Sequence, residues 1–378
     1  MELKRLKFID KSFVIILLVI IGFGLIILDS ATNSLTSNPD YYIKKQIVNV
    51  AVGLVLGILV IFFDYTQFRR YSKLIYFVSL LLLVAVLLFG EEAKGSARAI
   101  SIAGLPSLQP AEFAKVFIIV AFADFLIKRQ EQLNTIKQLL PCFVYMGLPV
   151  FLILLQPDLG TALVFVAITV VMLYIAGADA RLLTRLIAAG VLITAILLFL
   201  HFQFGMWLPL EDYQIKRLTV FVNPYEDGQG GRGLGWNTIQ SLVAIGSGGF
   251  SGKGLFAGTQ VQLNFLPEHH TDFIYAVIGE ELGFIGAALL IVLYGILLVR
   301  AARISFDAKD LYGTLIIMGI SAMWLFHIFE NIGMSIGLMP ITGIPLPFIS
   351  YGGSSMMANL IAVGFILSIN IRGKGLIF

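Results

Sequence analysis

The chain has 378 residues, of which 58% are hydrophobic and 13% are charged, and its formal net charge is +3. A soluble domain is about half apolar and about one quarter charged, so the composition excludes an ordinary soluble protein and predicts an integral membrane protein. Cys142 is the only cysteine, which excludes an intramolecular disulfide and a cysteine-rich zinc site.

Ten apolar stretches of the chain approach the length of about 20 residues that a helix needs to cross a bilayer. The first follows a basic segment, but no small-residue cleavage site comes after it, so we interpret it as an uncleaved span rather than a signal peptide. We predict an all-α fold, with one polytopic membrane domain over residues 1–378. The predicted spans are 12–30, 46–63, 74–90, 109–127, 141–157, 159–177, 186–205, 274–299, 313–336 and 355–371.

Basic residues in the loops orient these spans, because cytoplasmic loops carry an excess of lysine and arginine. Loops on one side contain Lys4, Arg5, Lys7, Lys11, Arg69, Arg70, Lys73, Lys128, Arg129, Lys137, Arg181, Arg185, Arg300, Arg303, Lys309, Arg372 and Lys374. The short loops on the other side contain only Lys44, Lys45, Lys94 and Arg98. Both termini are therefore predicted to be cytoplasmic.

The connection between the seventh and eighth spans, residues 206–273, is a long extracellular loop. Long connections are usually functional or disordered, and the apolar segments at 239–245 and 263–266 predict partial order on the membrane surface. The glycine-rich runs at 227–235 and 246–254 permit anion binding by backbone N–H groups. Neither run fits GxxxxGK[ST], which excludes a P-loop nucleotide site.

Ionisable residues inside predicted spans are costly and are usually paired or functional. Glu112 and Lys115 are three positions apart and can pair on one helix face, either as a structural ion pair or as part of a substrate site. Asp158 can cap the following helix or take part in chemistry. His327 shares a helix face with Glu330, and we interpret it as a hydrogen-bonded core residue.

The stretch NFLPEHHTDF, residues 264–273, packs Glu268, His269, His270 and Asp272 into five positions of a mostly apolar chain. Zinc normally needs three or four ligands at suitable spacing, and adjacent histidines rarely point the same way, so a zinc site here is not expected. A carboxylate can share Mg²⁺ or Mn²⁺ with substrate phosphates, or Asp272 can act as a general base. Thr271 or Asp272 can also simply cap the eighth span. These alternatives remain open on the residues alone.

Four motifs in order resemble the SEDS family (shape, elongation, division and sporulation proteins). They are QPAEFAK (109–115), QPDLGTA (156–162), FLPEHHTDFIYAVIGEELGFIG (265–286) and MPITGIPLPFISYGGSS (339–355). The resemblance covers essentially all ten predicted spans. Within the family, the segments GTQVQLNFLPEHHTDF (258–273) and GIPLPFISYGGSS (343–355) are more similar to the elongation type, RodA, than to the division type, FtsW.

The resemblance implies a peptidoglycan glycosyltransferase of the bacterial cell membrane that polymerises lipid II during elongation. It implies an active site on the extracytoplasmic side and a class B penicillin-binding protein as the transpeptidase partner. The family's essential aspartate corresponds to Asp272. The other matched positions are Glu112 and Lys115, which line the cavity beneath that aspartate, Asp158 of the QPD motif, and Ser350 and Tyr351 of the PFISYGG loop.

The chemistry implied is an inverting transfer that forms a β-1,4 bond and releases undecaprenyl pyrophosphate. Our hypothesis makes Asp272 the base for the acceptor hydroxyl, or else the ligand of Mg²⁺ or Mn²⁺. Lys216, Arg217 and Lys115 are candidates to offset the pyrophosphate charge. His270 is expected beside Asp272, whereas His269 is expected to be solvated.

Two functions of other classes compete with this hypothesis, namely a lipid II flippase and a non-enzymatic scaffold for the transpeptidase. A flippase should place its critical charges near the middle of the membrane. Asp272 instead falls at the edge of a predicted span. No zinc, nucleotide or nucleic acid is expected as a cofactor or partner.

Overall fold

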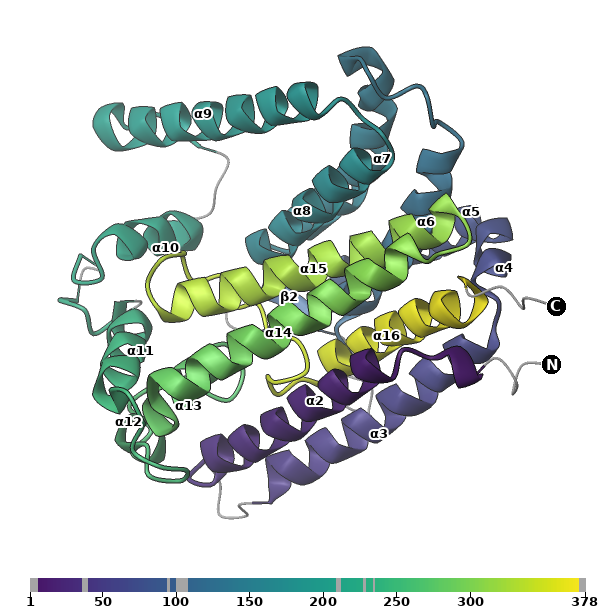
Figure 1. Cartoon of the computed structure of the whole chain (residues 1–378). Coiled ribbons are helices and arrows are strands. Elements are labelled where there is room, and N and C mark those ends of the chain that lie inside the picture. The colour runs from purple at the N-terminus through teal and green to yellow at the C-terminus, as the bar shows by residue number, and fades with distance from the viewer. Residues whose placement is uncertain are drawn as a thin grey trace.

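The computed structural model describes residues 6–35, 40–93, 96–99, 108–208, 212–226, 229–233 and 235–373. Of the residues used above for orientation and anion binding, Lys4, Arg5, Lys94, Lys374 and part of the glycine-rich run 227–235 lie outside this set. All long elements of the described part are helices (Figure 1). One short antiparallel hairpin, β1 (Glu91–Ala93) with β2 (Ser96–Ala99), adds a feature that the sequence did not predict.

Each of the ten predicted spans coincides with helical structure. The long helices are α2 (Lys11–Thr32), α3 (Tyr41–Phe62), α5 (Ser72–Phe89), α6 (Pro110–Ile127), α7 (Ile136–Leu154), α8 (Leu159–Ile175), α9 (Ala180–Phe204), α14 (Gly283–Phe306), α15 (Leu311–Ser335) and α16 (Gly353–Gly373). Eight helices of the described part are long and apolar enough to cross a membrane. The two others are α8, which is shorter, and α6, which holds Glu112, Lys115 and Asp124.

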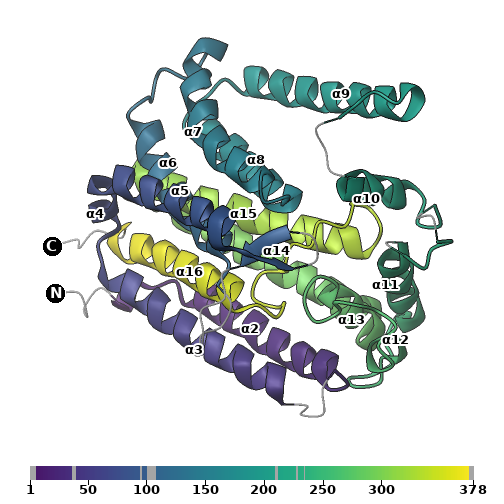
Figure 2. The same ribbon diagram turned by 180° about the vertical axis from the view of Figure 1, so that it is seen from behind.

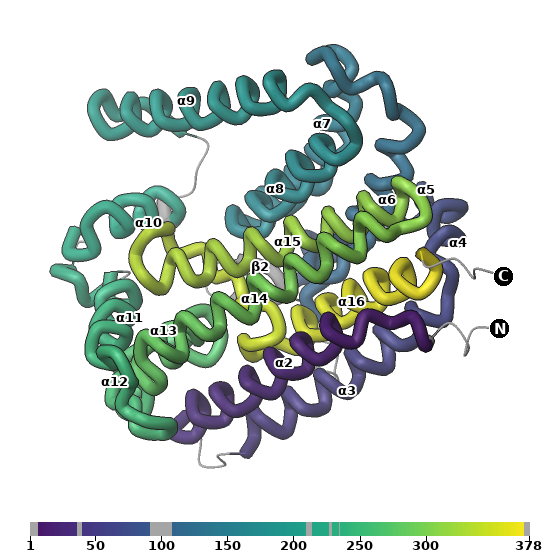
Figure 3. Tube along the Cα trace, viewed as in Figure 1, coloured from purple at the N-terminus to yellow at the C-terminus, as the bar shows by residue number. Residues whose placement is uncertain are grey.

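The long loop of the sequence prediction is largely helical. It contains α10 (Asp212–Val222), α11 (Gly235–Gly248) and α12 (Thr259–Gln262), and α13 (Ile274–Glu281) follows it. The remaining short helices are η1 (Leu6–Phe8) and α4 (Tyr65–Arg70). The chain trace places α10 to α12 together at the end of the bundle opposite both termini (Figure 3).

The predicted eighth span is not one continuous helix, because it breaks at Leu282 between α13 and α14. Gly283 follows the break with a φ of 65°, and a Cβ there would lie 2.3 Å from the backbone nitrogen of Gly252. The N–H groups of Lys253 and Gly254 donate to the carbonyls of Glu280 and Glu281, at 3.0 and 2.9 Å. The loop around Gly252 therefore packs tightly against the break and fixes the position of α13.

The helices differ sharply in how much protein surrounds them. In α16, 94% of the apolar membrane-spanning stretch is buried inside the protein, and in α15 the corresponding fraction is 72%. These two helices therefore form the centre of the bundle. In α9 only 6% is buried, and Figures 1 and 2 both show it lying apart from the other helices. Most of the α9 surface is therefore left for lipid.

Candidate active site

Asp272 lies in a tight turn that leads into α13. Glu268 has a φ of 53°, and its carbonyl accepts hydrogen bonds from the N–H groups of Thr271, Asp272 and Phe273 at 3.2, 3.0 and 3.2 Å. The buried side chains of Leu266 and Phe273 pack with Ala244 and anchor the turn on α11. Phe273, with no side-chain capping bond, occupies the N-cap position, so the prediction that Thr271 or Asp272 caps this helix was wrong.

A buried asparagine joins this turn to the loop that follows α15. Asn331 Nδ2 donates to the carbonyl of Asp272 and to the carbonyl of Ile344, both at 2.8 Å. Gly343 lies against the carboxylate, because a Cβ there would be 3.2 Å from Asp272 Oδ2. The half-buried carboxylate is thus held between its own turn and residues 342–344.

Substitution of Gly343 by alanine is expected to lower the rate of a reaction that uses the Asp272 carboxylate at least about tenfold. Small displacements of a reacting group are costly in rate. The φ of 75° already disfavours an L side chain, by about 1–2 kcal/mol, and the new methyl would press on Asp272. Gly337→Ala is the matched control, since φ is 73° but its Cβ would only touch the Leu242 side chain at 3.6 Å. Equal initial rates of the two variants would contradict this expectation.

The PFISYGG loop is joined to the same turn by two hydrogen bonds. Ser350 Oγ donates to the carbonyl of Thr271 at 2.6 Å and accepts from the N–H of Leu346 at 2.8 Å. The N–H of Tyr351 donates to the carbonyl of His270 at 3.0 Å. Ser350 therefore has a structural function in this arrangement, whereas the half-buried Tyr351 ring reaches the surface.

Aromatic rings lie against His270, in the turn that carries Asp272. The ring of Tyr42, on α3, lies 5.2 Å from His270 and 5.1 Å from Tyr351 between centroids. Burial raises the pKa of the Tyr351 phenol above its ordinary value, so it remains a neutral hydrogen-bond donor. Half-exposed rings of this kind can stack on the apolar face of a sugar, and Tyr42 joins the candidate site as a residue that sequence reasoning missed.

His269 is buried, although the sequence predicted that it would be solvated. It is 1% exposed, and its ring nitrogens lie 2.5 Å from the carbonyl oxygen of Leu266 and 2.8 Å from that of Ala31. That expectation was wrong because the C-terminal end of α2, remote in sequence, covers the ring.

The predicted ion pair in α6 is present and deeply buried. Lys115 Nζ lies 2.8 Å from Glu112 Oε1 and 3.0 Å from His327 Nε2, and all three residues are at most 3% exposed. Glu330 lies one turn farther along α15, where it accepts a hydrogen bond from Thr342 Oγ1 at 2.9 Å. This arrangement favours a structural function for Glu112 and Lys115, with α15 connecting them to the loop beside Asp272.

Asp158 caps α8, as one of the two sequence interpretations predicted. Its carboxylate accepts from the N–H and the hydroxyl of Thr161, at 3.1 and 3.0 Å. The first turn of α8 packs on the Asp272 region, since a Cβ at Gly160 would lie 2.9 Å from the side chains of both Thr342 and Ile344.

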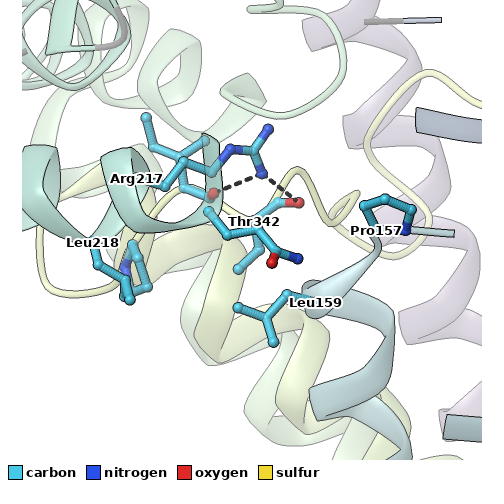
Figure 4. A pocket seen from close by; sticks show the side chains of 8 residues that line it. Pro157, Leu159, Arg217, Leu218 and Thr342 are labelled. Carbon is cyan, nitrogen blue, oxygen red and sulfur yellow. Dashed lines mark hydrogen bonds between the residues drawn. The ribbon is translucent and has the colours of Figure 1, made fainter. Parts of the chain in front are cut away.

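Arg217 and Lys216 have different environments although they are adjacent in α10. Arg217 Nη1 donates to the carbonyls of Ile341 and Thr342, at 3.0 and 3.5 Å (Figure 4). Lys216 is exposed. Arg217 lines a small pocket with a cavity volume of about 20 Å³, whose other lining residues are Pro157, Leu159, Gln214, Leu218, Pro340, Ile341 and Thr342. Residues 340–344 are therefore the common neighbours of Arg217, Glu330 and Asp272.

Comparison with known proteins gives a consistent assignment. Residues 10–374 match the model of the FtsW, RodA and SpoVE family, which is described as "Cell cycle protein". The chain belongs to this family. It is 37% identical to the "Probable peptidoglycan glycosyltransferase FtsW" of Trichlorobacter lovleyi, over 97% of this chain and 94% of that protein. It is 34% identical to the "Peptidoglycan glycosyltransferase MrdB" of Escherichia coli K12, again over 97% and 94%.

A solved structure matches the fold as well. It is described as "Structural coordination of polymerization and crosslinking by a peptidoglycan synthase complex", and the match has a TM-score of 0.78 and 29% identity, with 97% of this chain and 98% of that chain covered. The FtsW/RodA/SpoVE chain is thus a membrane protein and a peptidoglycan glycosyltransferase. Relatives named for division and for elongation match it at similar identity.

The described residues of this FtsW/RodA/SpoVE member contain no group of three or more His, Cys, Asp or Glu side chains suited to a metal ion. Asp272 alone fits only an ion that takes most of its ligands from water and substrate phosphate, as Mg²⁺ commonly does. Such an ion would supply positive charge to the pyrophosphate.

Proposed function

We propose that the chain polymerises lipid II on the extracytoplasmic face of the bacterial cell membrane, with Asp272 as the general base. The observation that carries this proposal is the position of the Asp272 carboxylate. It is half-buried and rests against Gly343, which belongs to the loop whose Ile341 carbonyl accepts a hydrogen bond from Arg217. The Asp272 carboxylate and the Arg217 guanidinium thus both contact the backbone segment 341–343.

The reaction then proceeds as a direct displacement with inversion. The 4-hydroxyl oxygen of the acceptor GlcNAc forms a bond to the anomeric carbon of the donor, while the bond from that carbon to pyrophosphate oxygen breaks. Asp272 takes the hydroxyl proton on the face opposite the leaving group, as the base does in inverting glycosidases. Undecaprenyl pyrophosphate leaves with the electron pair.

Arg217 is the best placed of the three candidate cations to bind the pyrophosphate. Its guanidinium lines the pocket beside residues 340–342, whereas Lys216 is exposed and Lys115 is 1% exposed and bound to Glu112 and His327. A guanidinium can bind phosphate oxygens in a two-pronged geometry. We assign Arg217 to the leaving group, with Mg²⁺ or Mn²⁺ shared between Asp272 and pyrophosphate as the alternative source of charge. His270, Tyr351 and Tyr42 are assigned to the sugars.

The membrane arrangement that fits this chemistry has ten spans in one domain, with both termini in the cytoplasm. The charged residues of α6 favour its inclusion as a span, because Glu112, Lys115 and Asp124 are buried inside the protein rather than exposed to lipid. The turn that carries Asp272 precedes α13, at the end of the bundle away from both termini (Figures 1 and 2). The outer face is therefore the side assigned to the reaction.

The resemblance of residues 258–273 and 343–355 to the elongation type supports a function in cell elongation. A class B penicillin-binding protein is the proposed partner, since the matched solved structure is described as a complex that coordinates polymerization and crosslinking.

The purified chain, in detergent with its class B penicillin-binding protein, is expected to convert lipid II into glycan polymer without any membrane gradient. Polymer length on gels is the readout, with and without a chelator. Loss of polymer on chelation would assign the charge to a divalent cation, whereas unchanged polymer would assign it to Arg217. Absence of polymer in every arm, together with lipid II transfer across vesicles, would instead identify a flippase, and absence of both activities would favour a scaffold.

A further inference from the structure

The carboxylate of Glu280 binds three donors of the segment 253–260 at a single oxygen. Glu280 lies at the C-terminal end of α13 and is fully buried. Its Oε1 atom accepts from Lys253 Nζ at 2.6 Å, from the N–H of Gln260 at 3.0 Å and from Thr259 Oγ1 at 3.2 Å. Lys253 Nζ also donates to Thr259 Oγ1, at 2.8 Å. These contacts fix the segment on the end of α13, because a buried charge is costly unless it is paired and hydrogen-bonded.

Gln260 connects this carboxylate to the turn that carries Asp272. Its N–H donates to Glu280, and its carbonyl accepts from the N–H groups of Phe265 and Leu266, at 3.0 and 3.3 Å. The buried side chain of Leu266 is one of those that anchor the turn on α11. The two polar groups of the Gln260 backbone therefore link the C-terminal end of α13 with the start of the turn that precedes its N-terminal end.

The helix α13 connects the same two places directly. All eight of its residues are buried, and at 1.5 Å per residue it is about 12 Å long. It packs against α11 without space for a side chain, because a Cβ at Gly248 would lie 2.0 Å from the carbonyl oxygen of Gly279. A short helix enclosed in this way moves as one body. A shift at the Glu280 end is therefore transmitted to the Asp272 end.

We propose that Glu280 is a positioning residue, which holds the Asp272 carboxylate in place by fixing α13 to residues 253–266. This inference rests on the proposed function of Asp272. Glu280 is eight positions from Asp272 in the sequence and is fully buried, so it acts on the geometry of the turn rather than on the substrate. Misplacement of a reacting group by about 1 Å can cost about 100-fold in rate.

Kinetics of the purified complex on lipid II test this function. Glu280→Gln keeps an acceptor oxygen for the Gln260 N–H but loses the charge that holds Lys253, so kcat is expected to fall about tenfold with little change in KM. Lys253→Met should cause a similar loss, and Lys253→Arg should restore most of the rate because it keeps the cation. The losses should not add in the double variant Glu280→Gln/Lys253→Met, since both substitutions remove one ion pair.

Asp124→Asn is the matched control for the loss of a buried charge. Asp124, on α6, is 2% exposed, and its carboxylate accepts from Ser72 Oγ at 2.6 Å, from Arg69 Nε at 3.1 Å and from Lys128 Nζ. This substitution should lower Tm, as Glu280→Gln does, but leave kcat close to wild type. A Glu280→Gln enzyme with the kcat of wild type, or with a loss no larger than that of Asp124→Asn, would overturn the proposal.

Hydrogen exchange of the backbone amides gives a readout that does not need activity. Glu280→Gln is expected to speed exchange in residues 259–273 about tenfold and to leave α6 unchanged, because local opening depends on local contacts. Gly258→Ala is a second variant, which keeps the ion pair. The φ of −68° at Gly258 suits alanine, but the new Cβ would lie 2.9 Å from Glu280 Oε2, so the same amides should exchange faster.

Asp272→Asn measured in parallel separates this inference from the proposed function. An active Asp272→Asn enzyme would remove the base assignment, and the positioning function with it, while the exchange results for Glu280→Gln and Gly258→Ala would stay as expected. Unchanged exchange of residues 259–273 in both of those variants would overturn the function of Glu280 alone, and Asp272 would remain the base.

Discussion

Replacing Asp272 with asparagine is expected to lower the rate of glycan polymerisation about 10²–10⁴-fold, which is the usual contribution of a positioned general base. Asparagine is nearly the same size but cannot take the proton of the acceptor hydroxyl. The bond from Asn331 reaches the main-chain carbonyl of Asp272, so it survives the substitution and keeps the turn in place. Initial rates with purified lipid II, at equal amounts of folded protein, measure the effect.

Asp40→Asn is the matched control for this substitution. Asp40 is an exposed carboxylate next to α3, and its side chain pairs with Lys44 at 2.8 Å. Its loss should leave the rate close to that of wild type. An Asp272→Asn enzyme within a few-fold of wild type would exclude Asp272 as the base.

Replacing Lys115 with methionine is expected to destabilise the fold by about 3–5 kcal/mol, because it leaves a buried carboxylate without its partner. Glu112 is 3% exposed and Lys115 is 1% exposed, so water cannot compensate for the missing charge. The double variant Glu112→Gln/Lys115→Met should recover most of the lost stability, since no uncompensated charge remains. Thermal unfolding in detergent, read as Tm, measures these two variants and the single variant Glu112→Gln.

Lys44→Met provides the comparison for an exposed pair of similar spacing. Lys44 and Asp40 are 70% and 59% exposed at the side chain, and such surface pairs contribute little. Its Tm should stay near that of wild type. If the losses from Glu112→Gln and Lys115→Met simply add in the double variant, the pair is not the structural unit described here.

Much of the fold could be predicted because it depends on local properties of the chain. Length and hydropathy located ten helical segments, since a membrane span needs only a sufficient apolar run. The pairing of Glu112 with Lys115 followed from their spacing on one helix, and the capping by Asp158 followed from its position before α8. Each of these contacts joins residues that are three positions apart in the sequence.

The features that could not be predicted depend on residues that are far apart in sequence. The burial of His269 requires Ala31, and the aromatic contact of His270 requires Tyr42. A tyrosine near the start of a span is also typical of the membrane interface, so Tyr42 gave no distinct signal. The break at Leu282 depends on the loop around Gly252, because only the folded chain brings that backbone against Gly283.

The central claim is that Asp272 performs proton transfer rather than substrate binding. Measuring lipid II affinity and polymer formation on one preparation of Asp272→Asn tests it most directly. We expect a Kd within about threefold of wild type, since the lost proton transfer belongs to the transition state and not to the ground state, together with almost no polymer. Polymer at the wild-type rate, or a loss of polymer fully explained by a weaker Kd, would contradict it.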